Sequence, residues 1–179
     1  MPAYASLLAG FDPLVTDHAQ AEAAAFALMA DHAAMPSGGA AREVLVCYDD
    51  DLAPDLADVA LATRLSRNEV IAAHLAGDYR VFMSGFAPGY AYLAGVPASL
   101  QLPRKPAALR GIPAGSVLIA GPQCLVTTLT MPTGWWIIGC SPTPVLSDDP
   151  DRPFLLDVGD TVIFRQFDRR AFDAQERRG

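Results

Sequence analysis

The sequence predicts an α+β fold in which an α-rich first part is followed by a β-rich second part. Charge supports this division, because residues 1–79 carry 12 acidic and 3 basic side chains, whereas residues 80–179 carry 8 acidic and 10 basic ones. Proline supports it as well, since 11 of the 15 prolines lie from Pro88 to Pro153 and leave few windows for a helix. We therefore expect an N-terminal α/β domain at 1–78, a β domain at 79–168 and a charged tail at 169–179.

The first part combines helix signals with two short apolar runs. Thr16 or Asp17 can cap a first helix, Asp55 can cap a second, and Ser66 and Glu69 form a capping box for a third. His74 lies near the end of the third helix, where we expect a partly exposed side chain. The predicted elements are a strand at Tyr4–Ala9, a helix at His18–Ala34, a strand at Glu43–Tyr48 and helices at 55–63 and 66–75.

From Tyr79 onward the apolar periodicity changes from about 3.6 to about 2 residues, which indicates strands. Turns rich in Gly and Pro separate these strands at short intervals. This pattern favours a closed barrel or a sandwich over a parallel sheet. The predicted strands are Tyr79–Ser84, Ser116–Ala120, Cys124–Thr130, Trp135–Gly139 and Asp160–Phe167.

Composition excludes several classes of function. The net charge is −7 and the chain has one lysine, so the clustered cations that neutralise nucleic-acid phosphates are absent. No apolar run reaches the roughly 18 residues of a membrane span, and the start lacks the basic residues of a signal peptide, so we expect a cytoplasmic protein. The three cysteines show neither CxxC nor Cys/His spacing, so we expect no disulfide framework and no metal site. The acidic run Asp49-Asp50-Asp51 lacks the ligand spacing of a calcium loop and predicts a solvated turn.

The segment from Gly85 to Gly95 is the first candidate for a binding loop. It places the aromatic residues Phe86, Tyr90 and Tyr92 among three glycines and a proline. Glycines let a backbone approach a ligand closely, and such a loop can expose its rings. The segment has no GK[ST] ending, so it is not a phosphate-binding P-loop.

A cluster of three cations follows within seven residues, at Arg104, Lys105 and Arg110. Prolines flank this cluster, and an arginine fork is suited to bidentate contact with a carboxylate or a phosphate. A solvated loop explains the same pattern equally well. The sequence leaves both interpretations open.

The paired residues Trp135 and Trp136 lie between glycines and suggest one core anchor and one pocket wall. Cys124 and Cys140 could act as nucleophiles, but residues 80–179 contain no histidine to activate them. A Cys/His pair is therefore excluded within this half of the chain, and we predict core positions for both thiols.

Together the motifs resemble a known family. The series GFxPGYxYLxGVP, PRK, IPAGSVLIAGPQ, PTGWWIIGCSPTP and LLxVGDTVIF is similar to that of allophanate hydrolase subunit 1, KipI-type sporulation-kinase inhibitors and the B subunit of 5-oxoprolinase. This resemblance runs from Pro2 to Phe167. It implies carboxyltransferase subdomains C and D, with a small N-terminal α/β domain followed by a cyclophilin-like β-barrel.

The resemblance implies a subunit of an ATP-dependent amide-processing hydrolase complex, of the 5-oxoprolinase or allophanate-hydrolase type. Such a chain acts with a second cyclophilin-like subunit, of the type of allophanate hydrolase subunit 2 or the C subunit of 5-oxoprolinase, and shares ATP with its partners. In the bacterial 5-oxoprolinase the subunits drive the opening of 5-oxoproline to glutamate. The alternative is a non-catalytic module that inhibits a sensor histidine kinase. Prolyl isomerase activity is disfavoured, because no cyclophilin-type active-site motif is present.

Nine residues are candidates for substrate binding under this resemblance, and no residue is identified as catalytic. Three would hold an anion, two would form hydrogen bonds, and four would wall the pocket. In that order they are Arg104, Lys105 and Arg110; Ser116 and Gln123; and Phe86, Tyr90, Tyr92 and Trp135.

The sequence departs from the family pattern at four places. Members usually begin with a further strand and helix that carry an LGDxALLV-like segment, which is absent here. Ala108-Leu109 replaces a second Pro-Arg pair, Cys140-Ser141 replaces a segment with an arginine, and Thr127 replaces a tyrosine. We therefore expect an incomplete first domain and a pocket with fewer cationic and hydroxyl groups than is usual.

Overall fold

The computed structural model describes residues 8–30 and 38–177, which fall into two compact units, Met1–Gly38 and Gly39–Gly179. The described part of the first unit contains helix α1 (His18–Ala30). Asp17 begins this helix as predicted, because its carboxylate accepts the Gln20 N–H at 2.8 Å. The predicted strand at Tyr4–Ala9 and the predicted helix end at Ala34 lie largely outside the described residues.

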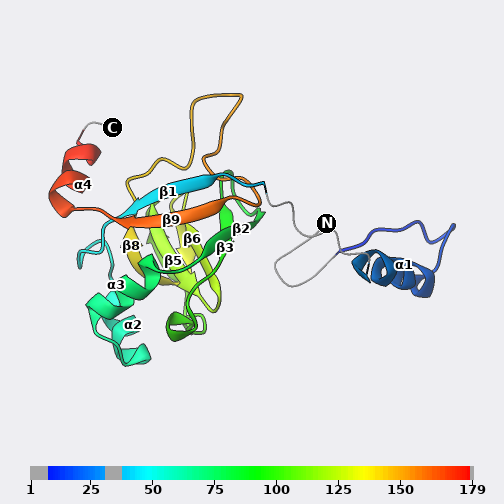
Figure 1. The fold of residues 1–179 in the computed structure, drawn as a ribbon, viewed down its shortest axis with the longest axis horizontal. Helices are drawn as coiled ribbons and strands as arrows, with labels where there is room; N and C mark the ends of the chain where they lie inside the picture. Colours follow the sequence, from blue (N-terminus) through cyan, green and yellow to red (C-terminus); the bar gives the residue numbers. More distant parts are fainter. Residues whose placement is uncertain (1–7, 31–37, 178–179) are drawn as a thin grey trace. The chain divides into compact units, whose positions relative to one another are not determined.

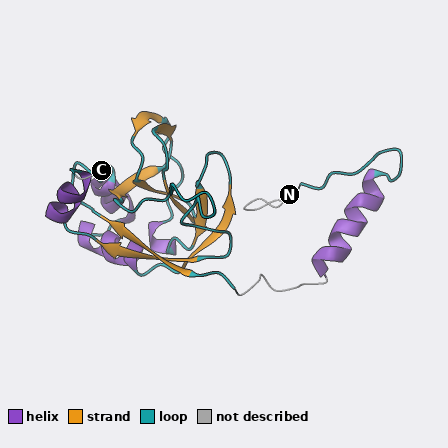
Figure 2. Ribbon diagram, turned by 90° about the horizontal axis from the view of Figure 1, so that it is seen from above, coloured by secondary structure: helices purple, strands orange, loops and turns teal. Residues whose placement is uncertain are grey.

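The second unit is built on a seven-stranded sheet in the order β1-β9-β2-β3-β6-β5-β8 (Figure 1). The parallel pair β1 and β9 joins residues far apart in the chain, and the other neighbours are antiparallel. The two edge strands also meet, because Cys47, which follows β1, and Cys140, the last residue of β8, exchange backbone hydrogen bonds of 2.8 and 2.9 Å. The sheet therefore curls into a nearly closed barrel, as Figure 2 shows from above. The strands are β1 (Ala41–Val46), β2 (Tyr79–Ser84), β3 (Ala91–Ala94), β5 (Ser116–Ala120), β6 (Gln123–Val126), β8 (Trp136–Cys140) and β9 (Thr161–Gln166).

Helices α2 (Leu56–Thr63) and α3 (Arg67–Leu75) lie together at one end of this sheet (Figure 1). The predicted capping box begins α3, because Ser66 Oγ accepts the Glu69 N–H and Glu69 accepts the Ser66 N–H. The helices share one hydrophobic core with the strands. Its members include Leu56 and Val70 from the helices and Val44, Val81 and Phe164 from the sheet. The predicted α+β fold with a barrel-like sheet is confirmed.

The shared core contains residues from both sides of Asp78, where we predicted a domain boundary. Strand β1 pairs with β9, so the sheet contains strands from both sides of Asp78, and the two compact units meet at Gly38 and Gly39 in the sequence. The predicted strand at Glu43–Tyr48 was placed in a separate first domain, because pairing with a strand so distant in the chain leaves no local signal in the sequence. The domain ranges 1–78 and 79–168 stay a prediction.

Several elements escaped sequence analysis. β4 (Leu109–Ile112) and β7 (Met131–Thr133) form a separate two-stranded ribbon, and β3 lies within the predicted aromatic loop. The expected charged tail contains helix α4 (Arg169–Glu176), which Asp168 caps through the Ala171 N–H at 3.2 Å. Phe172 anchors α4 against Cys47 and Cys140. One apolar side chain per turn was too weak a pattern to predict a helix.

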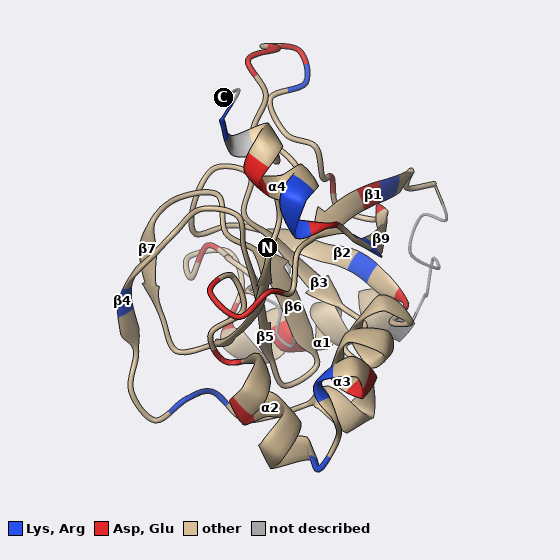
Figure 3. Cartoon of the chain, turned by 90° about the vertical axis from the view of Figure 1, so that its left-hand side faces the viewer, with Lys and Arg blue, Asp and Glu red and all other residues tan. Residues whose placement is uncertain are grey.

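Many acidic residues of this unit lie in loops and near helix ends (Figure 3), and two of them form ion pairs with arginines. Asp50 pairs with Arg67, and Asp51 pairs with Arg169. No set of three or more His, Cys, Asp or Glu side chains in the described ranges is placed to hold a metal ion. None of the described helices is long and apolar enough to cross a membrane.

Candidate functional site

A cavity of about 210 Å³ opens beside the β2–β3 turn and the β4–β7 ribbon. Five of the nine predicted site residues line it, so the structure brings the aromatic motif, the arginine and one tryptophan together. The sequence analysis did not predict the lining residues that come from β7 (Met131–Thr133). Their Pro-Thr-Gly segment directly before the tryptophans was the signal that could have indicated them. The lining consists of Phe86, Tyr90, Tyr92, Arg104, Met131, Pro132, Thr133, Gly134 and Trp135.

Four aromatic rings form a continuous chain along this cavity. Ring centroids are 5.4 Å apart for Phe86 and Tyr90, 5.3 Å for Tyr90 and Tyr92, and 6.2 Å for Tyr92 and Trp135. A tight turn supports the first pair, because the Gly85 N–H donates to Tyr90 O at 3.1 Å. Phe86 has a φ of 77° and a side chain that is 78% exposed. An unusual backbone conformation thus holds an apolar ring in solvent at the cavity mouth.

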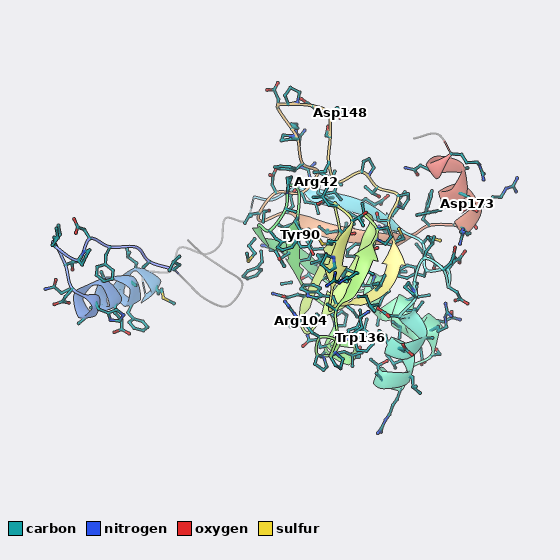
Figure 4. All side chains as sticks on the ribbon, turned by 180° about the vertical axis from the view of Figure 1, so that it is seen from behind. Arg42, Tyr90, Arg104, Trp136, Asp148 and Asp173 are labelled. Carbon is teal, nitrogen blue, oxygen red and sulfur yellow. The ribbon has the colours of Figure 1, made fainter. Side chains whose placement is uncertain are left out.

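Arg104 supplies the positive charge of the cavity. Its guanidinium carbon lies 5.5 Å from the centroid of the Trp135 ring, within the range of a cation–π contact. No carboxylate in residues 8–30 or 38–177 forms an ion pair with Arg104. The guanidinium fork can therefore receive an anionic ligand. Figure 4 labels Arg104 and Tyr90 in this region.

The two tyrosines of the cavity are hydrogen-bond donors at neutral pH. Burial raises the pKa of Tyr90 to about 12, although nearby Arg104 opposes the shift. Burial also raises the pKa of Tyr92, again against the effect of Arg104. Both hydroxyls keep their protons near pH 7 and can donate to a carbonyl or carboxylate oxygen.

Lys105 points away from this cavity. Its ammonium group lies 2.5 Å from Asp55 Oδ2, and the two side chains are 11% and 10% exposed. The same carboxylate oxygen accepts the Ile137 N–H at 2.7 Å. The predicted anion-binding lysine therefore forms an ion pair with the residue at the start of α2.

The remaining three predicted residues also lie outside the cavity lining. Arg110 is exposed on β4. Ser116 is buried on β5, where its hydroxyl donates to Pro113 O at 2.9 Å. Gln123 is half-buried on β6, opposite Ala94 and Ala120 in the sheet. The structure therefore separates these side chains from the aromatic chain.

His74 is fully buried, which corrects the prediction of a partly exposed histidine. Its Nε2 lies 3.7 Å from Cys124 Sγ. Residues 80–179 contain no histidine, so this Cys/His pair forms between the two halves of the sequence. Burial raises the pKa of the Cys124 thiol, and neither side chain reaches solvent. Cys124 therefore remains a core residue as predicted, because the reactive thiolate is disfavoured.

Comparison with known proteins agrees with this architecture. Residues 1–156 match the family described as carboxyltransferase domain, subdomain C and D. The chain belongs to this family. A protein from Bacillus subtilis that is named as the B subunit of 5-oxoprolinase is 41% identical over 132 residues, which are 74% of this chain and 55% of that protein. The protein of the same name from Escherichia coli O157:H7 is 40% identical over 122 residues, which are 68% and 56% of the two chains. The family predicted from the motifs is thus confirmed, and the matches span about half the length of these relatives.

Solved structures show the same fold. A conserved uncharacterized protein from Pyrococcus horikoshii is 33% identical, with a TM-score of 0.71 over 96% of this chain and 79% of that one. The urea carboxylase of Kluyveromyces lactis is 14% identical, with a TM-score of 0.70 over 92% of this chain and 17% of that one. At this identity the second likeness concerns the fold alone.

Proposed function

We propose that this chain is a subunit of an ATP-dependent 5-oxoprolinase complex and that its aromatic cavity binds the substrate. The observation that carries the proposal is Arg104, which lies over Trp135 without a carboxylate partner in the described chain. Relatives at 36–41% identity are named as B subunits of 5-oxoprolinase. The name of these relatives suggests 5-oxoproline as the substrate, and the cavity beside Arg104 would accept its carboxylate.

The chemistry of 5-oxoproline suits the residues that line the cavity. The substrate has a five-membered lactam ring and one carboxylate. Arg104 would bind the carboxylate through its guanidinium fork, and the rings of Tyr92 and Trp135 would pack against the lactam ring. The hydroxyl of Tyr90 or Tyr92 would donate a hydrogen bond to the lactam carbonyl oxygen, where charge increases as the amide is attacked.

This chain would bind and orient the substrate, and partner subunits would complete the catalytic site. The cavity lining contains no carboxylate, histidine or cysteine that could serve as a general base. We therefore assign no catalytic residue to this chain. The partner is a second cyclophilin-like subunit in a cytoplasmic hetero-oligomer, and ATP would activate the amide within that assembly.

The test is a coupled assay of the chain co-expressed with its partner subunits, ATP and 5-oxoproline. Arg104→Ala should raise the KM for 5-oxoproline at least about tenfold, because the carboxylate loses its charged partner. Arg152→Ala is the matched control, since Arg152 lines a different cavity, and should leave the KM within about twofold. Absence of ATP turnover with both 5-oxoproline and a urea-derived amide would overturn the proposal. Inhibition of a sensor histidine kinase that Arg104→Ala leaves unchanged would favour the non-catalytic alternative instead.

A further inference from the structure

Two neighbouring cations lie against two neighbouring tryptophans, but on opposite sides of the chain. Arg104 lies over Trp135 at the cavity, whereas Lys105 Nζ lies 5.8 Å from the centroid of the Trp136 ring. Trp136 packs against the main hydrophobic core instead of lining the cavity. Successive side chains of an extended segment point to opposite sides. The Arg104–Trp135 pair therefore lines the cavity, and the Lys105–Trp136 pair faces the protein interior.

Asp55 holds the interior pair. Aspartate at the start of a helix normally accepts a hydrogen bond from the first turn, but Asp55 makes no such side-chain bond to α2. Its Oδ2 accepts instead from Lys105 Nζ at 2.5 Å and from the Ile137 N–H at 2.7 Å. The Asp55 N–H also donates to Ile137 O at 3.0 Å. One carboxylate therefore connects α2, β8 and the segment that carries Arg104.

Backbone contacts hold the residues on both sides of Arg104. The Trp136 indole N–H donates to Pro103 O at 2.7 Å, and the Lys105 N–H donates to Gly134 O at 2.7 Å. The Arg104 guanidinium makes a cation–π contact with Trp135 and forms no ion pair with a residue in 8–30 or 38–177. The backbone is thus fixed while the charged group stays available.

We infer that the buried Asp55–Lys105 pair is a positioning device that keeps the Arg104 guanidinium over Trp135 and directed into the cavity. Fixing this segment before binding reduces the conformational entropy that an anion must overcome. The inference rests on the proposed function for the identity of the anion. The position of Arg104 relative to Trp135 does not depend on that identity and can be measured directly.

The test follows the indole N–H resonance of Trp135 in the full chain by NMR, with Trp135→Phe for its assignment. Arg104→Ala gives the reference shift for a ring without its cation. Lys105→Met should move the resonance at least half of the way to that reference. It should also weaken 5-oxoproline binding about tenfold in the assembled complex. In the Arg104→Ala background, Lys105→Met should have no further effect on binding, because both changes remove the same interaction.

A double variant separates position from stability. Lys105→Met alone leaves a buried carboxylate without its cation, which destabilises the protein. Adding Asp55→Asn removes that charge and keeps an amide oxygen for the Ile137 N–H. The double variant should recover thermal stability while its Trp135 resonance remains displaced, and it provides the same readout where Lys105→Met alone does not fold.

Two results would overturn the inference: a wild-type Trp135 resonance in Lys105→Met, or its return in the double variant. Either would show that the pair contributes to stability only. If wild-type protein does not bind 5-oxoproline but Lys105→Met still displaces the resonance, the proposed substrate is wrong and the positioning role stands.

Discussion

His74 on α3 and Cys124 on β6 lie side by side in the core, with 3.7 Å between Nε2 and Sγ. His74 Nδ1 lies 2.7 Å from the hydroxyl oxygen of Tyr48. The tilted rings of Phe164 and Tyr79 have their centroids 4.6 and 5.3 Å from the centroid of the imidazole ring. No described carboxylate forms an ion pair with this imidazole. His74 therefore packs α3 against the barrel, and burial disfavours its protonated form.

This contact predicts acid-sensitive stability. Burial lowers the pKa of His74 to about 3, whereas an unfolded histidine titrates near 6.5. As the pH falls through about 6.5, the unfolded chain takes up a proton that the folded chain excludes until about pH 3, so stability is lost across this range. At pH 4.5 the loss from this residue should be on the order of 2–3 kcal/mol. Urea unfolding between pH 7.5 and 4.5 measures it.

His74→Gln is the matched control for that experiment. The glutamine amide can still form a hydrogen bond with Tyr48, but it does not titrate. Its free energy of unfolding should be lower than that of the wild type at pH 7.5 and should depend less on pH below 6.5. Equal pH dependence in both proteins would show that other groups, such as carboxylates, cause the acid sensitivity.

A second prediction concerns Gly95, at the end of β3. Its φ is 122°, and a Cβ at this position would lie 2.1 Å from the backbone oxygen of Asp78. Gly95→Ala should therefore destabilise the protein by more than about 3 kcal/mol. Gly121 is a suitable control, because it has a φ of 53° and nothing within 4 Å of an added Cβ. Gly121→Ala should cost about 1–2 kcal/mol, and equal losses in thermal unfolding would contradict the steric argument.

The hydroxyl of Tyr79 supports a third prediction. It is buried and has no hydrogen-bond partner in the described chain. Tyr79→Phe removes an unsatisfied polar group at almost constant volume, so stability should stay equal or rise by about 1 kcal/mol. Tyr48→Phe also removes one hydroxyl but leaves His74 without its partner, and it should lower stability by about 1–2 kcal/mol. Chemical denaturation compares the two variants, and a destabilised Tyr79→Phe would reveal a partner for that hydroxyl.

Local signals predicted most of the helices and strands of this fold, but not how distant strands pair. The capping box at Ser66 and the alternation from Tyr79 to Ser84 gave α3 and β2 correctly, because both patterns lie within a few residues. The pairing of β1 with β9 and the ribbon of β4 and β7 depend on segments that meet only in three dimensions. Short strands such as Met131–Thr133 also carry too few residues for a periodicity.

The candidate site likewise shows what residue types indicate locally and what depends on distant parts of the chain. The aromatic loop, Arg104 and Trp135 were predicted as site residues under the family resemblance, since the residue types of the cation cluster alone fitted a solvated loop equally well. Lys105 was assigned to the same role, since the sequence does not show that Asp55, 50 residues earlier, pairs with it. Residue types thus suggested candidate site residues, and only the fold separated Arg104, which lines the cavity, from Lys105, which pairs with Asp55.

That separation gives the last prediction, which compares Arg104 with Arg110. Both are exposed arginines of the predicted cationic cluster, but only Arg104 lines the cavity. Arg104→Lys keeps the charge but loses the planar fork, so the KM for 5-oxoproline should rise about three- to tenfold. Arg110→Lys and Arg110→Ala should leave the KM within about twofold, since Arg110 lies on β4 and is not among the residues that line the cavity. Steady-state kinetics of the assembled complex measures the KM of each variant. A larger rise in KM for the Arg110 variants than for Arg104→Lys would contradict the prediction and place the substrate carboxylate at the β4–β7 ribbon.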